Sequence, residues 1–170
     1  MHVQFSMRAK NAFLSSIALN VLAIVCAHYL LPARTALHFN AQGRVDRWGT
    51  HVEFIVINLF LVIATYYAIE YGAKLALKFP KFLISLPNKD YWLSPEKRPL
   101  AEQKLTDYLR YFGMFNVLYQ TIILGLIVVA HQHTPVRLNA PMMAVLTLVF
   151  LLITGFWCVR LYRAFKHVTP

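Results

Sequence analysis

Four long stretches of the chain carry no charged residue, and they limit the possible folds more than any other feature. They run from Ala12 to Leu31, from Phe54 to Ile69, from Tyr111 to Ala130 and from Met142 to Val159. About 20 apolar residues in a helix span the hydrocarbon core of a bilayer, whereas a surface helix of a soluble domain needs a polar face. The sequence therefore predicts an all-α membrane protein, a single domain over residues 1–170 that forms a four-helix transmembrane bundle. Its helices are expected at about 12–31, 52–71, 111–130 and 142–161.

The basic residues are shared unequally between the segments that flank these helices. The composition, 17 Lys and Arg against 7 Asp and Glu, would suit a nucleic-acid-binding protein. With both termini on the inner side, however, that side holds 13 basic residues and the outer side 4. The positive-inside rule then places both termini and the loop 72–110 in the cytoplasm. The excess positive charge thus orients the protein in the membrane and faces anionic lipid headgroups, so no nucleic-acid partner is predicted.

The first apolar stretch is longer than the core of a secretory signal peptide, and we expect it to be retained as a helix. The cytoplasmic loop 72–110 is predicted to contain an amphipathic helix that starts near Pro99 and leads into the third transmembrane helix. It either orients the bundle or docks a cytoplasmic partner. Before it, Tyr91 and Trp92 are expected to anchor at the membrane interface.

Polar side chains inside the predicted helices are candidates for contacts between helices. Asn20, Asn58, Asn116 and Gln120 occupy three of the four stretches, and amides in hydrocarbon usually bond across helices. They serve either to hold the bundle together or to line a polar path. Thr121 and Gly125 have the spacing of two small residues that can seat a neighbouring helix. Near the inner surface, Glu70 and Lys74 have the spacing of an ion pair within one helix.

Histidines gather on the predicted outer side. Imidazole and carboxylate groups bind divalent metals, and histidine also titrates near neutral pH. Three readings stay open, namely ordinary interfacial residues, a pH sensor, or a site for a divalent metal. The candidate metal ligands are His28, His38, His51, Glu53, His131 and His133.

The outer loop 32–50 carries the densest motif and is expected to be ordered. Asn40 to Gly43 reads as a turn in which Gly43 can adopt a positive φ. Asp46 is expected to bond nearby backbone or to pair with Arg44 or Arg47. The loop forms either a structural cap, closed by hydrogen bonds from His38, Asn40 and Asp46, or a binding surface. The candidate binding residues are His38, Phe39, Asn40, Gly43, Asp46 and Trp48.

This loop resembles the domain of unknown function 1648. Leu31-Pro32 followed by His38-Phe39-Asn40, Gly43, Asp46 and Trp48 is similar to the pattern that follows the first helix of that family. A second segment, Leu86 to Glu96, looks like a motif of small bacterial members, carried here by Pro87, Asn88, Asp90, Tyr91, Trp92 and Glu96. The family also includes the membrane domain of an immunity protein that protects against a secreted toxic peptide in the sporulation-delaying toxin system. The resemblance implies a bacterial inner-membrane protein with the His38-to-Trp48 loop outside.

Catalytic motifs for hydrolysis, metalloproteolysis or phosphate binding are missing from the sequence. Two classes of function remain. One is a binding, signalling or immunity-type membrane protein whose outer loop recognises a peptide or an envelope protein. The other is a metal-dependent envelope protein, either a chaperone or an enzyme, that uses the outer histidines.

Overall fold

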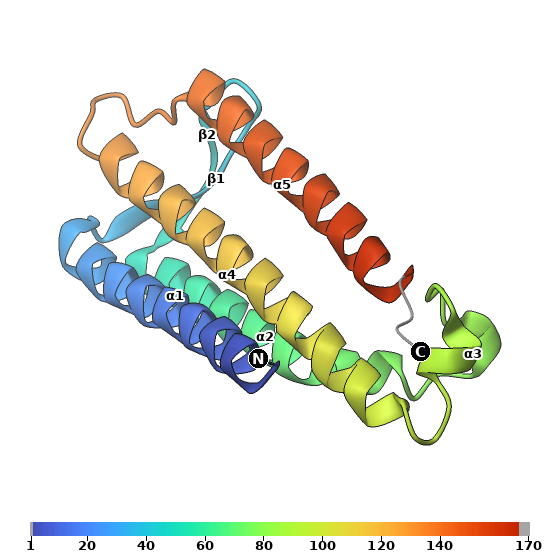
Figure 1. The fold of residues 1–170 in the computed structure, drawn as a ribbon. Helices are drawn as coiled ribbons and strands as arrows, with labels where there is room; N and C mark the ends of the chain where they lie inside the picture. Colours follow the sequence, from blue (N-terminus) through green and yellow to red (C-terminus); the bar gives the residue numbers. More distant parts are fainter. Residues whose placement is uncertain (1, 167–170) are drawn as a thin grey trace.

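A computed structural model describes residues 2–166 and contains four long helices, a two-stranded sheet and two short helical segments. The elements follow in the order α1 (His2–Leu30), β1 (Arg34–Phe39), β2 (Val45–Thr50), α2 (His51–Ala76), η1 (Lys81–Leu83), α3 (Lys89–Trp92), α4 (Arg98–Ala130) and α5 (Ala140–Lys166). Figure 1 shows the long helices side by side, with the sheet at one end of the bundle and α3 at the other.

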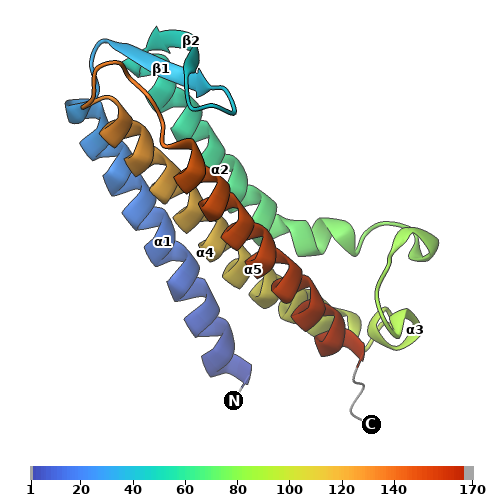
Figure 2. The same ribbon diagram turned by 90° about the horizontal axis from the view of Figure 1, so that it is seen from above.

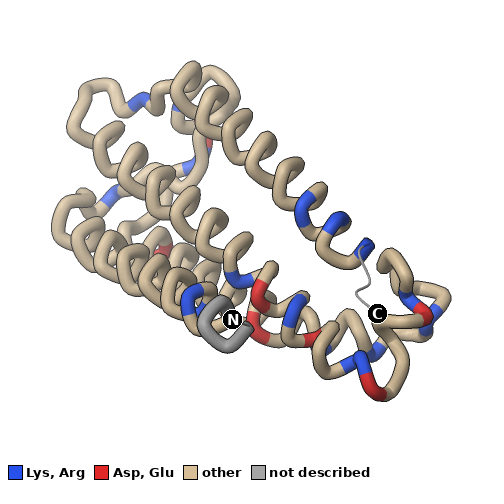
Figure 3. The backbone as a smooth tube through the Cα atoms, in the orientation of Figure 1, with Lys and Arg blue, Asp and Glu red and all other residues tan. Residues whose placement is uncertain are grey.

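The four long helices confirm the predicted transmembrane bundle. Each is long and apolar enough to cross a membrane, and the shortest apolar span, Ser6–Leu30, has 25 residues. At 1.5 Å per residue it is about 37 Å long, which exceeds the hydrocarbon core of about 30 Å. The chain is therefore a multi-pass membrane protein. Figure 3 shows the charged residues near the ends of the helices and uncharged stretches between them.

The observed helices are longer than predicted because they continue beyond the uncharged stretches. α1 already includes Arg8 and Lys10, and α5 runs to Lys166. α4 begins at Arg98 with proline in its first turn and continues without a break to Ala130. The predicted amphipathic helix and the third transmembrane helix are thus one element. Long basic side chains are good helix formers, so a helix need not end where the hydrocarbon core ends.

α1, α2 and α4 form the tightly packed part of the molecule. Their shared core contains Phe13, Ile24, Val62, Val117 and Leu124. Gly113 lets α4 approach α1 and α2 closely, because a Cβ atom there would lie 2.8 Å from both Phe13 of α1 and Ile69 of α2. Lipid tails are as apolar as leucine, so close packing of this kind is what drives helices together in a membrane.

α5 lies beside α4 and is covered much less than the other helices. No residue of its most apolar 18-residue stretch is buried. In Figure 1, α5 runs along one side of α4, apart from α1 and α2, and in Figure 2, seen from above, α5 lies over α4. Aromatic side chains make the contact: Tyr119 stacks on Phe150 with ring centroids 4.4 Å apart, and Phe112 meets Trp157 at 4.8 Å.

The predicted outer loop is a β-hairpin. β1 and β2 pair antiparallel from Arg34 opposite Thr50 to Phe39 opposite Val45, with two register irregularities around His38. The connecting turn has Gly43 at φ 75°, which confirms the turn expected at this position. β2 leads directly into α2 through a capping box: the Thr50 hydroxyl accepts from the Glu53 N–H, and the Glu53 carboxylate accepts from the Thr50 N–H.

Candidate functional site

An exposed pair of side chains joins the two hairpin strands. Nδ1 of His38 lies 2.6 Å from Oδ1 of Asp46, as a hydrogen bond from imidazole to carboxylate. Asp46 was expected to bond nearby backbone or to pair with Arg44 or Arg47, and its partner is instead His38, which was itself expected to help close the loop by hydrogen bonds. In the irregular register His38 pairs with Arg47 of β2, and its imidazole bonds to the carboxylate of the neighbouring residue Asp46. The pair closes the hairpin across its strands.

Asn40 and Gly43 build the turn and dock it on the bundle. Oδ1 of Asn40 accepts from the N–H groups of Gln42 and Arg44, each at 3.0 Å. The carbonyl of Gly43 accepts from the N–H of Leu138, in the loop between α4 and α5, at 2.9 Å. A Cβ on Gly43 would overlap the carbonyl oxygen of Leu138. These two motif residues therefore have a structural role that ties the hairpin to the start of α5.

The aromatic members of the motif lie on different sides of the hairpin. Phe39 lines a hollow between the turn and α5, whereas Trp48 faces β1 and the end of α4. The guanidinium of Arg34 lies 5.0 Å from the Trp48 ring centre, a cation–π arrangement. The edge of the His131 ring meets the same indole with centroids 6.4 Å apart. Trp48 thus contributes to the contact between hairpin and helices.

His131 is a bridge between α4 and the hairpin. Its Nε2 accepts from the N–H of Ala36 at 3.0 Å, and its Nδ1 donates to the carbonyl of Ile127 at 2.8 Å. One nitrogen must accept while the other donates, which corresponds to the neutral ring protonated at Nδ1. Sequence reasoning grouped His131 with metal ligands and did not identify this structural use.

The six predicted metal ligands do not converge. The rings of His28 and His51 approach with centroids 5.3 Å apart, but His131 bonds to backbone, Glu53 belongs to the capping box, and His38 holds Asp46. Over residues 2–166, no group of three or more His, Cys, Asp or Glu side chains is placed to hold a metal ion. A divalent metal at the outer histidines stays a prediction from the sequence.

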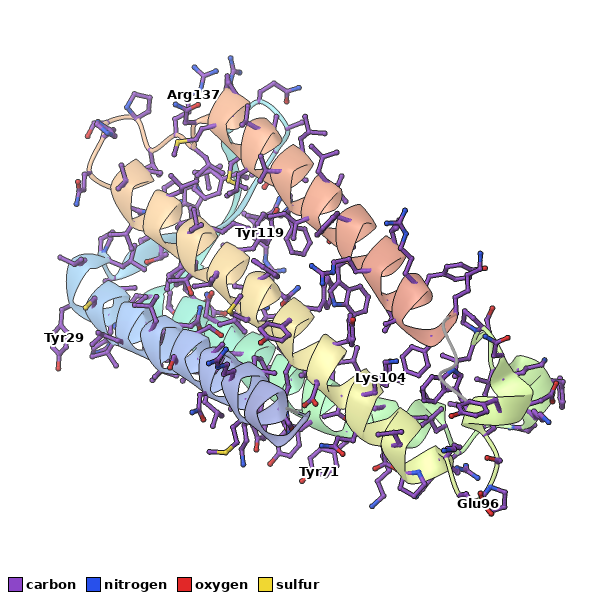
Figure 4. All side chains as sticks on the ribbon, viewed as in Figure 1. Tyr29, Tyr71, Glu96, Lys104, Tyr119 and Arg137 are labelled. Carbon is purple, nitrogen blue, oxygen red and sulfur yellow. The ribbon has the colours of Figure 1, made fainter. Side chains whose placement is uncertain are left out.

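A hollow of about 450 Å³ opens where the hairpin turn meets the ends of α4 and α5. Its polar lining includes Gln42, His133, Arg137 and Asn139, and its apolar lining includes Leu126 and Met142. Nη2 of Arg137 donates to the carbonyl of Gln42 at 3.4 Å. Figure 4 labels Arg137 at this end of the molecule. Only His133 was singled out from the sequence, because nothing in the local pattern shows that residues 42 and 137 meet.

The second motif segment closes the far end of α5. Nδ2 of Asn88 donates to the carbonyl of Lys166 at 2.7 Å and to that of Phe165 at 3.4 Å. Nε1 of Trp92 donates to the Phe165 carbonyl at 2.8 Å, and Nζ of Lys104 donates to the carbonyl of Ala164. The last four carbonyl groups of a helix have no partner within it. We call Asn88, Trp92 and Lys104 the C-terminal clamp.

Trp92 is buried within this clamp, so its predicted role as an interface anchor is wrong. The residue is only 5% exposed, and its ring meets the Phe165 ring with centroids 5.1 Å apart and has the Lys104 ammonium 4.6 Å from its centre. Figure 4 shows Lys104 between α4 and the end of α5. Asn88 adopts φ 51°, a left-handed conformation that asparagine tolerates better than most residues.

The other members of this motif lie around the clamp. Asp90 pairs with Lys81, and this hydrogen bond lowers the pKa of the Asp90 carboxyl below its usual value. The Tyr91 ring lies 5.4 Å from the Lys97 ammonium. Pro87 lines a hollow beside Tyr162, and Glu96 is exposed. The segment therefore supports the clamp with surface contacts.

A charged cluster joins α1, α2 and α4 near the same end. Arg110 binds both oxygens of Glu70, at 2.9 and 2.7 Å, and lies 3.2 Å from Asp107. The Ser6 hydroxyl donates to Asp107 at 2.9 Å. The predicted pairing of Glu70 with Lys74 was wrong, because the planar guanidinium of Arg110 engages the carboxylate with two hydrogen bonds from the neighbouring helix.

The amides within the spans confirm part of the expected bonding between helices. Asn20 of α1 donates to the Thr121 hydroxyl of α4 at 2.8 Å, and Gln120 donates to Thr65 of α2 at 3.1 Å. Asn116 accepts from Gln120 on the same helix. Asn58 instead donates to the Phe54 carbonyl of its own helix. No atom outside its own helix lies within 4 Å of a Cβ built on Gly125, so Gly125 seats no helix in the part of the chain described.

Comparison with known proteins supports the resemblance at the outer loop. Residues 16–63 match the family model described as Domain of unknown function (DUF1648). The match confirms the resemblance predicted for this segment, which comprises most of the apolar span of α1, the hairpin and the first half of α2. The clamp residues lie outside it. No curated protein and no solved structure matches the chain.

Proposed function

We propose that this chain is a non-catalytic binding and signalling protein of a bacterial inner membrane. Both termini lie in the cytoplasm and the hairpin lies outside, as the excess of basic residues on the other side supports. The hairpin and the α4–α5 loop bind a peptide or an exposed segment of an envelope protein. The cytoplasmic segment 87–104 reports that binding.

The observation that carries this proposal is the attachment of α5 at both of its ends. At one end, Leu138 is bonded to the Gly43 carbonyl in the hairpin turn. At the other end, the C-terminal clamp binds three successive carbonyl groups, those of Ala164, Phe165 and Lys166. Between them, α5 packs mainly against α4 and buries little surface. A helix held in this way transmits a shift at one end to the other as a rigid body.

The hollow at the hairpin turn offers the chemistry for an anionic group beside an apolar side chain. Arg137 supplies a guanidinium and Asn139 an amide, and Leu126 and Met142 supply an apolar wall. Guanidinium groups bind carboxylates with paired hydrogen bonds. A peptide with an acidic residue, or with its terminal carboxylate, next to an apolar residue fits this lining.

Site-specific crosslinking in native membranes tests the proposal. A photoreactive residue at Gln42 faces the hollow, and the same residue at the exposed position Ala64, in the middle of α2, is the control. We expect one other polypeptide to be captured from position 42 and not from 64, and Arg137→Gln to reduce capture at least fivefold. Equal capture at both positions, or none at 42, would overturn the proposed binding site.

The proposed orientation has a separate test. A fluorescent protein fused after Pro170 is expected to fluoresce in the cytoplasm, and alkaline phosphatase at the same position is expected to be inactive. An active phosphatase would place the hairpin in the cytoplasm and remove the proposed outer partner.

A further inference from the structure

An apolar cavity of about 350 Å³ lies between α4 and α5, on the half of the bundle away from the hairpin. Its walls are two stripes of side chains with helical spacing. Tyr108 and Phe115 belong to α4, and Ile153, Trp157 and Arg160 belong to α5. Residues separated by three, four or seven positions share one face of a helix. The two stripes therefore face each other across the cavity.

The back wall of this cavity is fixed by a hydrogen bond and an aromatic contact. Nε1 of Trp157 donates to the carbonyl of Tyr108 at 2.9 Å, and the Trp157 ring packs on Phe112 with centroids 4.8 Å apart. The indole and this ring are rigid groups that set the separation between α4 and α5. The bond holds the indole in place, so the helices cannot close on the cavity unless this ring moves.

The cavity is open toward the hydrocarbon of the membrane. It lies within two helices that span the bilayer, and at its mouth the Phe156 side chain is 64% exposed and that of Phe115 is 36% exposed. The surrounding solvent at this depth is lipid rather than water. A cavity of a few hundred Å³ with an apolar lining is of the size that binds small apolar ligands. An acyl chain is the apolar ligand that the surroundings supply.

Arg160 gives this apolar cavity a charged end. It lies six residues before Lys166, so its Cα is about 9 Å from the end of the helix at 1.5 Å per residue. Its guanidinium lies 5.8 Å from the centre of the Phe156 ring. Within residues 2–166, no carboxylate lies within ion-pair distance of Arg160. A long arginine side chain at this depth reaches the level of the lipid phosphates.

We propose that this cavity binds one anionic phospholipid from the surrounding leaflet. One acyl chain lies between the aromatic stripes of α4 and α5, and Arg160 binds the phosphate. Charge complementarity favours an anionic lipid, because Arg163 and Lys166 follow Arg160 on the same exposed helix. The lipid then covers a part of α5 that no other helix within residues 2–166 covers.

Native mass spectrometry of the purified chain, extracted from membranes that contain phosphatidylglycerol and phosphatidylethanolamine, tests this site. We expect one phosphatidylglycerol per chain to be retained through detergent exchange. Arg160→Gln is expected to lower its retention at least fivefold. Arg163→Gln, which removes the same charge from an exposed position outside the cavity lining, is the matched control and is expected to change retention less than twofold.

A second variant tests the acyl-chain part of the proposal without changing any charge. Ile153→Trp adds bulk to the cavity wall and is expected to lower retention at least fivefold at both 0.05 M and 0.5 M salt. Surface attraction alone would fall with salt, because a Debye length shrinks from about 14 to 4 Å over this range. Equal losses in Arg160→Gln and Arg163→Gln, full retention in Ile153→Trp, or no retained lipid in the native chain would overturn the proposal. A second copy of the chain covering this face would do the same.

Discussion

α1 and α5 both run beside α4, but they are held there by different means. α1 is joined to α4 along its length, through buried Phe13 at Gly113 and through the bond from Asn20 to Thr121. α5 depends on aromatic rings, on the bond from Trp157 to Tyr108, and on hydrogen bonds at its ends such as those of the C-terminal clamp. In lipid, apolar surface alone does not bring helices together. A small residue allows the close interface between α1 and α4, whereas polar contacts at the ends of α5 position it beside α4.

The largest expected effect is on the close interface, where Arg110→Leu removes the partner of two carboxylates. Arg110 and Glu70 are 15% and 16% exposed, and an acidic group left unpaired in such surroundings costs about 3 kcal/mol. We expect a clear loss of thermal stability in detergent, followed by circular dichroism. Glu70→Gln leaves Arg110 paired with Asp107 and is expected to cost less. A smaller loss for Arg110→Leu than for Glu70→Gln would contradict this account.

The next largest effect on stability is expected from a substitution at Gly113, compared with the same substitution at Gly155. Gly113→Ala is expected to cost about 2 kcal/mol, because the added methyl group enters a space already filled by Phe13 and Ile69. Gly155→Ala on α5 is the matched control, since its Cβ meets no atom of the described chain within 4 Å. Its midpoint of thermal unfolding is expected to be unchanged or raised. If both substitutions destabilise equally, α5 is packed more closely than its exposure indicates.

A smaller effect is expected at the C-terminal clamp. Trp92→Phe keeps most of the ring contact with Phe165 but removes the N–H donor to its carbonyl. The loss of one hydrogen bond corresponds to about 1 kcal/mol. We expect faster amide exchange in the last two turns of α5 and little change in α1, measured by hydrogen–deuterium exchange. Increased exchange throughout the bundle would show that the clamp stabilises the whole fold instead.

The smallest effect is expected at the exposed pair of Asp90 and Lys81. The hydrogen bond from Lys81 lowers the pKa of Asp90 below its usual value, and Lys89 acts in the same direction. The ion pair therefore restrains the segment between Lys81 and Asp90 above about pH 4. This restraint is lost as the pH falls through the lowered pKa of Asp90. Asp90→Asn is expected to leave the unfolding midpoint unchanged. Spin labels at residue 84 should become more mobile below pH 4 in the native chain, whereas in Asp90→Asn their mobility should not depend on pH.

The sequence was sufficient for the features that depend on local pattern. The four helices follow from uncharged stretches, the continuous α4 from its spacing, and the turn at Gly43 from its residue types. The partners of Glu70 and Trp92 were not predictable, because each depends on residues that the fold brings together. Arg110 lies 40 positions from Glu70, and Phe165 lies 73 positions from Trp92. For Glu70, local spacing instead pointed to the nearer partner Lys74.

The candidate site likewise has one part that the sequence predicted and one part that it did not. The hairpin motif was found from residue types and from its resemblance, and the match over residues 16–63 supports it. The hollow at Arg137 could not be found, because it exists only where the α4–α5 loop crosses the hairpin turn. Predicted metal ligands were chosen for their chemistry, whereas the structure uses several of them as helix caps and backbone partners.

The C-terminal clamp also sets an order for assembly during synthesis. The Asn88 amide and the Trp92 indole leave the ribosome 77 and 73 residues before the Phe165 carbonyl that they bind. Until α5 has been inserted, these donors have only water or lipid headgroups as partners. α1, α2 and α4 can complete their own contacts before that point. Insertion of α5 is therefore the event that joins this helix to a preformed three-helix unit.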